Sequence, residues 1–108
     1  MKIKQGVELA GLRVPMRAVK VICEEVYKRH GHESVITSAL EGKHSLGSYH
    51  PFGYALDYRI RFLKDKAEYL EVAQEIREGL KRQWIVNKYP KGYTVVLEST
   101  HIHIQYNK

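Results

Sequence analysis

Residues 54–62 have the sequence YALDYRIRF, with large apolar side chains at the even positions and small or charged ones at the odd positions. Because successive side chains of a β-strand point to opposite faces, this alternation predicts a half-buried strand. Asp57 and Arg59 then share one face, and the large apolar side chains share the other.

Two helices are expected on either side of this strand. Pro15 suits the first position of a helix, and Gly31 supplies its end. An apolar face at helical spacing is formed by Val19, Ile22, Cys23, Val26, Tyr27 and His30. Asp65 and Glu68 form a capping-box-like start for the second helix. Its expected buried face consists of Leu70, Ala73, Ile76, Leu80 and Trp84.

Three further strands are predicted at residues 34–38, 93–98 and 101–106. Ser99 and Thr100 join the last two strands as a hairpin. Residues 41–53 contain three glycines and several other breakers, which is typical of a loop. The resulting order predicts an α+β fold, in which two main helices accompany a small antiparallel sheet.

Length and composition exclude several classes of protein. A chain of 108 residues fits a single domain, here residues 1–108, and one Cys excludes an internal disulfide. We interpret Cys23, on the apolar helical face, as a core residue. No apolar run approaches the ~18 residues of a membrane span. The charged start has no apolar stretch behind it, so we expect no signal peptide and synthesis in the cytoplasm. The net charge of +6 indicates an anionic partner.

The six histidines have different expected environments. We interpret His30 and His32, which flank the end of the first helix, as solvated. His101 and His103 lie two apart in the last predicted strand, so their side chains share a face. A bound cation would explain two adjacent imidazoles, because neutral imidazole is a common zinc ligand. An exposed strand with solvated histidines is an equally good interpretation of the spacing alone.

The loop before residues 54–62 favours the metal. His50 and Asp57 are separated by six residues that include Gly53, which allows a sharp turn, and the small Ala55. A His, an Asp and a His from another strand make a three-ligand site with an open fourth position, which is the catalytic form of a zinc site.

These residues resemble a known family. The pattern S-x-H-x-x-G-x-A-x-D is the signature of the zinc D-Ala-D-Ala carboxypeptidases and L-alanyl-D-glutamate endopeptidases, whose fold is shared by lysostaphin-type peptidases and the hedgehog signalling domain. All five fixed positions are met, by Ser48, His50, Gly53, Ala55 and Asp57. The pair His101 and His103 is similar to the family's second motif. Residues 11–13, 35–38, 41–45 and 95–98 also resemble small phage and prophage members, and the likeness covers roughly residues 6–106.

The resemblance implies roles for individual residues. His50 and Asp57 are implied as zinc ligands, with His103 favoured as the third and His101 left as the alternative. The family places an acidic residue three positions before the ligand, but Thr100 stands three before His103. Glu98 stands three before His101, so we interpret Glu98 as the general base and His101 as the residue near the substrate oxyanion. Ser48 and Lys43 are expected to contact substrate, with His44 and Ser45 as further candidates for the cleft.

The implied function is zinc-dependent hydrolysis of an amide in the peptidoglycan stem peptide or cross-link. The enzyme would act at the bacterial wall, released through a holin or carried by a virion. Arg13, Arg59 and Arg61 are candidates for holding a substrate carboxylate.

Two alternatives remain. A domain of the same fold could bind zinc without catalysis and recognise cell wall or a protein partner. A nucleic-acid-binding module is the third interpretation, but the basic residues are dispersed along the chain, so we expect no nucleic-acid partner.

Overall fold

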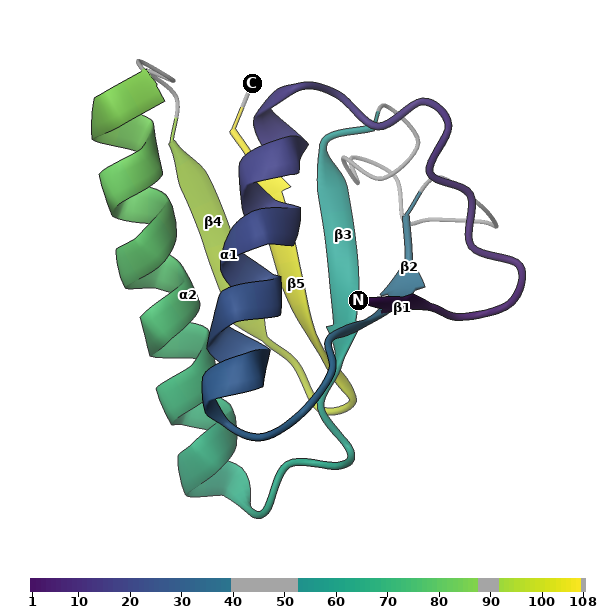
Figure 1. The fold of residues 1–108 in the computed structure, drawn as a ribbon, viewed down its shortest axis with the longest axis vertical. Coiled ribbons are helices and arrows are strands. Elements are labelled where there is room, and N and C mark those ends of the chain that lie inside the picture. Colours follow the sequence, from purple (N-terminus) through teal and green to yellow (C-terminus); the bar gives the residue numbers. More distant parts are fainter. Residues whose placement is uncertain (40–52, 88–91, 108) are drawn as a thin grey trace.

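The computed structural model describes residues 1–39, 53–87 and 92–107, with side chains described throughout except for residues 83–87. The described elements are five strands and two helices (Figure 1). In chain order they are β1 (Lys2–Ile3), α1 (Pro15–Arg29), β2 (Val35–Ser38), β3 (Ala55–Arg59), α2 (Lys66–Asn87), β4 (Tyr93–Leu97) and β5 (His101–Tyr106). The α+β class and the two main helices are therefore confirmed.

The sheet is mixed, so the prediction of an antiparallel sheet was wrong in one respect. Its strand order is β1-β2-β3-β5-β4, and β1 pairs with β2 in parallel while the other neighbouring pairs are antiparallel. The two residues of β1 are too few to show an alternating pattern, so this strand could not be recognised from the sequence. β1 adds a parallel edge and leaves the central strands β3 and β5 antiparallel.

Helix α1 begins and ends as expected. Pro15 occupies the first turn, and Gly31 adopts a φ of +81° just beyond the end. The buried residues of the helix are Met16, Val19, Ile22, Cys23, Val26 and Tyr27. Cys23 is completely buried, and this burial raises the pKa of its thiol. Its assignment to the core is confirmed, because a buried thiol with a raised pKa is not a reactive nucleophile.

Helix α2 starts with the expected cap. The backbone N–H of Glu68 donates to Asp65 Oδ1 (2.9 Å), and the backbone N–H of Lys64 donates to Glu68 Oε1 (2.7 Å). The buried side chains that face the core are Val72, Ala73, Ile76 and Leu80. Leu70 is 52% exposed, which corrects its expected burial, because it lies to the side of the stripe that these four residues form. Trp84 lies outside the described side chains.

The two helices lie side by side on one face of the sheet (Figure 1). Beneath them the sheet contributes fully buried side chains from its central strands, namely Leu56, Tyr58, Ile102 and Ile104. The predicted alternation is observed over β3, with Leu56 and Tyr58 in the core, but the strand ends at Arg59, so residues 60–62 lie outside the strand predicted for 54–62. The intervening side chains of β3 and β5, including Asp57 and His103, project from the face that turns away from the helices.

Neither helix in the described part of the chain combines the length and apolar character that crossing a membrane requires.

Gly53 stands where the N-terminal segment touches the start of β3. Its φ is +78°, and a Cβ placed on it would overlap the carbonyl oxygen of Gly11. The backbone N–H of Arg13 donates to the Gly53 carbonyl (2.9 Å), which holds the two segments together. The motif glycine therefore supplies both a left-handed turn and room for a close backbone approach.

We expect Gly53→Ala to destabilise the fold by at least about 2 kcal/mol, because the strain of a left-handed alanine adds to the overlap with Gly11. Gly31→Ala is a matched control, since Gly31 has a similar φ of +81° but open space around its Cβ position. The control should lose only about 1 kcal/mol. Urea unfolding of both variants measures the difference, and equal losses would show that the contact with Gly11 contributes nothing.

Candidate functional site

The candidate site lies where the middle of β3 pairs with the start of β5. In the register of these strands Asp57 is opposite His103, and Arg59 is opposite His101. Residues opposite each other in an antiparallel pair point to the same face. His101 and His103 are partly exposed while Ile102 and Ile104 are buried, so the expected shared face of the two histidines is observed.

Asp57 and His103 are in direct contact. Asp57 Oδ1 lies 2.9 Å from His103 Nδ1, and the two side chains are 14% and 17% exposed. The other ring nitrogen, His103 Nε2, lies 2.8 Å from Gln105 Oε1. The hydrogen bond with Asp57 raises the pKa of His103, against the opposing effect of burial and with further support from Gln105. Gln105 was missed in the sequence, although its place two residues after His103 on the same face was a signal.

Glu98 and His101 form a second contact beside the first. Glu98 Oε2 lies 2.6 Å from His101 Nε2, and the same nitrogen is 3.7 Å from Asp57 Oδ2. The Thr100 hydroxyl lies 3.0 Å from His101 Nδ1. Glu98 reaches His101 because its backbone N–H donates to the His101 carbonyl (2.9 Å) across the predicted hairpin turn. The Glu98 side chain is 48% exposed, so water can reach its carboxylate.

The described part of the site therefore holds Asp57 in contact with both histidines, and His101 in contact with Glu98. The other residues expected at the site, Ser48, His50 and Lys43, lie outside the described residues, as do His44 and Ser45. The structure thus brings together the predicted site residues that it describes and leaves the loop residues untested.

The donor types suit zinc, which accepts imidazole nitrogen and carboxylate oxygen. Asp57 and His103 supply one donor of each type on neighbouring strands, in contact at 2.9 Å. In the described part of the chain, however, Asp57, His101 and His103 do not bring three donor atoms within 4.8 Å of one another. The described donors therefore make part of a metal site, to which the expected ligand His50 would have to be added.

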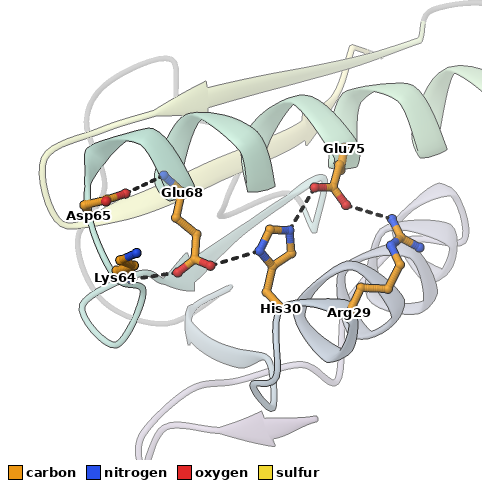
Figure 2. A network of polar contacts seen from close by, with 6 residues as sticks. All are labelled: Arg29, His30, Lys64, Asp65, Glu68 and Glu75. Carbon is orange, nitrogen blue, oxygen red and sulfur yellow. Dashed lines mark hydrogen bonds and ion pairs between the residues drawn. The ribbon is translucent and has the colours of Figure 1, made fainter.

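The described residues do contain one group of three such donors, and it lies elsewhere. Donor atoms of His30, Glu71 and Glu75 are within 4.8 Å of one another. Figure 2 shows that both ring nitrogens of His30 already face carboxylates, with Nδ1 3.1 Å from Glu68 Oε2 and Nε2 2.8 Å from Glu75 Oε2. This geometry is that of a protonated imidazole between two acids, so we interpret the group as an ion-pair network between α1 and α2.

The side chain of His30 is only 8% exposed, which corrects the interpretation of a solvated helix-end histidine. Arg29 extends the network, with Nη2 3.2 Å from Glu75 Oε1. Burial lowers the pKa of His30, but the hydrogen bonds to Glu75 and Glu68 outweigh it, and the pKa is raised overall. Glu68 accepts a hydrogen bond from the backbone N–H of Lys64 and a second one from the His30 ring, and both bonds lower the pKa of its carboxylate. Burial raises the pKa of Glu75, but His30 and Arg29 outweigh it and lower that pKa.

These pKa shifts predict how stability depends on pH. A raised histidine pKa contributes stability that is fully present below its usual value of 6.5 and is lost as pH rises through the raised pKa. The lowered pKa values of Glu68 and Glu75 contribute stability that is fully present above pH 4.5, the usual pKa of these groups. This stability is lost as the pH falls through the lowered pKa values. The network therefore stabilises the fold most between these two values.

We expect His30→Gln to cost more at pH 5.5 than at pH 9, by on the order of 1 kcal/mol, because the imidazolium is lost at the higher pH. Urea unfolding at both pH values measures this. Thr94→Val is the control, because the Thr94 hydroxyl donates to Asn107 Oδ1 (2.9 Å) and neither group titrates, so this substitution should cost the same at both pH values. An equal cost of His30→Gln at both pH values would contradict the charged network.

Comparisons of this chain with protein-family models, with curated proteins and with solved structures found no match.

Proposed function

We propose that this chain is a zinc-dependent peptidoglycan peptidase with the hedgehog/DD-peptidase type of fold. The observation that carries the proposal is the meeting of two motifs on one face of the sheet. Asp57, from the motif that begins at Ser48, contacts both histidines of the motif at residues 101–103. Asp57 and His103 are 46 residues apart in the sequence, so local sequence alone does not bring them into contact.

In this proposal His50, Asp57 and His103 hold the zinc ion. When bound, the ion polarises the scissile carbonyl and acidifies a water molecule. His103 is the better third ligand of the two histidines, because it pairs with Asp57 at 2.9 Å while His101 is held by Glu98 at 2.6 Å. His101 is left near the developing oxyanion, to which its ring would donate a hydrogen bond in place of one of its present contacts, Glu98 at Nε2 or the Thr100 hydroxyl at Nδ1.

Glu98 is the general base of the proposal. Its half-exposed carboxylate accepts the proton of the attacking water and passes it to the leaving amine. The contact with His101 fixes the position of this carboxylate on the side of the site where the oxyanion would form. Ser48 and Lys43 complete the proposal as substrate contacts from the loop.

The setting follows from charge and chemistry. A net charge of +6 favours an anionic polymer such as the bacterial wall, and the substrate is then the stem peptide or its cross-link. A lysin of a phage or prophage, acting at the wall after release or from a virion, is the biological role that we propose.

One observation favours a second function. Thr100 takes the position that the family gives to its acidic residue, and its hydroxyl contacts His101 Nδ1 at 3.0 Å. A domain that binds zinc without cleaving, and that recognises cell wall or a protein partner, would tolerate this threonine.

Incubation of the purified chain with peptidoglycan, with added zinc or with a chelator, separates the two functions. We expect mass spectrometry to find new amine and carboxyl termini only when zinc is present, and the fragment masses identify the bond that is cut. Zinc-dependent retention on the wall without new termini would instead support the non-catalytic domain.

A further inference from the structure

Strand β4 is an open edge of the sheet, because β5 is its one neighbouring strand in the described part of the chain. The backbone N–H of Glu98 donates to the His101 carbonyl, so the even-numbered residues of this segment direct their backbone groups toward β5. Successive residues of a strand direct these groups to opposite sides, so Val95 and Leu97 direct theirs away from β5. The edge therefore presents backbone groups with which another strand could pair.

A groove of about 380 Å³ runs between this edge and helix α2. Arg77 and Lys81 line it from the helix, and residues 93–95 line it from the strand. Both of these basic residues are exposed. Because α2 and β4 lie next to each other (Figure 1), a segment that paired with the edge would lie in the groove beside both cations.

Arg77 already occupies one group of the edge. Its Nε and Nη2 donate to the Val95 carbonyl (3.3 and 3.0 Å), and its Nη1 donates to Gln74 Oε1 (3.3 Å). Both acceptors are neutral. Among the side chains that the structure describes, no carboxylate forms an ion pair with Arg77 or Lys81. The positive charge of the groove is therefore not neutralised from within the described chain.

We propose that the β4 edge is a docking site for an extended acidic segment of a partner protein, which adds a sixth strand to the sheet. A peptide fits this edge because its backbone supplies donors and acceptors at the spacing of a strand. A carboxylate is a stronger acceptor for Arg77 than the Val95 carbonyl is. An acidic segment would draw Arg77 away and free that carbonyl to accept an N–H from the new strand. This docking site does not depend on the proposed peptidase activity.

A second copy of this chain is a poor occupant of the same edge. Two antiparallel β4 strands paired along residues 93–97 would be centred on Val95, where the Arg77 side chains of both copies would meet and repel each other. The net charge of +6 on each copy adds to this repulsion. Cationic side chains at a sheet edge commonly prevent pairing between copies, and here the same cations favour an acidic partner.

The alternation of side chains along a strand predicts the pattern of the partner. Val95 points to the face that the helices cover, and Val96, which is 40% exposed, points to the other face. Partner side chains opposite Val95 would therefore face the cations of α2, and those opposite Val96 would meet an apolar surface. The expected segment carries acidic residues at alternate positions, with β-branched apolar residues between them.

A peptide with this pattern tests the docking site. The probe is acetyl-Thr-Glu-Val-Glu-Val-Glu-Thr-amide, and the matched control peptide has Gln in place of each Glu. NMR titration of the full chain at low salt should show shifts and slowed hydrogen exchange at the amides of Val95 and Leu97. The acidic peptide should bind at least about fivefold more tightly than the control peptide. Arg77→Gln should remove most of this preference and Lys81→Gln part of it, whereas Arg17→Gln, an exposed charge on α1 outside the groove, should leave it unchanged.

Equal binding of the two peptides, or no binding of the acidic one, would overturn the acidic docking site. Equal effects of Arg77→Gln and Arg17→Gln would also overturn it, because they would indicate a general attraction to a basic protein. A third peptide, methylated at the backbone nitrogens of its three Glu residues, keeps the charge but cannot donate to the Val95 carbonyl. If it binds as tightly as the unmodified peptide, no strand is added. Shifts of Val95 and Leu97 that depend on the concentration of the chain alone would show that a second copy occupies the edge instead.

Discussion

Asp57→Ala should abolish the stabilisation of this chain by zinc. A ligand that binds only the folded state at about 100 times its dissociation constant adds about 2.7 kcal/mol. For a domain of this size that corresponds to a rise in melting temperature of roughly 10 °C or more. Asp57 contacts both histidines of the site, so its loss removes one donor and the group that orients the others. The zinc affinity should fall by more than the roughly 100-fold that loss of an outer-shell partner costs.

The measurement is thermal unfolding with and without zinc, together with metal analysis of the purified protein. Asp65→Ala is the matched control, because this cap of α2 should cost about 1 kcal/mol of stability and leave the zinc-induced shift intact. Glu75→Gln tests the other group of donors. If zinc still stabilises Asp57→Ala but no longer stabilises Glu75→Gln, the metal binds between the helices and the site on β3 and β5 is wrong.

Local patterns were sufficient for much of the fold. The start, the end and the buried face of α1 depend on residues within a few turns of one another, and all three were predicted. The alternation in β3 and the turn between β4 and β5 depend on neighbours in the same way. Leu70 shows the limit, since helical spacing admits a residue at the side of the buried stripe and only packing against the sheet excludes it.

Features that depend on distant partners could not be predicted. His30 meets Glu68 and Glu75, which lie 38 and 45 residues away, and no local signal separates this environment from solvent. The candidate site has the same dependence on strand register. A slip of one residue between β3 and β5 would turn Asp57 away from His103, although each strand would still match its sequence pattern.

Glu98→Gln should reduce hydrolysis of peptidoglycan by about 10²- to 10⁴-fold, the usual contribution of a general base. Glutamine keeps the size of the side chain and an oxygen that can face His101, but it cannot accept a proton. Zinc binding should be unchanged, which separates this variant from Asp57→Ala. Glu78→Gln, on the exposed side of α2 beside Gln74 (3.3 Å), is the control and should retain full activity.

Thr100→Glu completes the test, because it places an acid three residues before His103, where the peptidases that the sequence resembles have one. If Glu98 is the base, Thr100→Glu should not raise the activity above that of wild type, and adding Glu98→Gln to this variant should still remove the activity. If wild type and Glu98→Gln release fragments at the same rate, Glu98 is not the base. If wild type and Glu98→Gln both release no fragments, and Thr100→Glu creates activity, then the native threonine accounts for the missing catalysis. The non-catalytic zinc domain is then the function of this chain, since the scaffold would be complete except for its base.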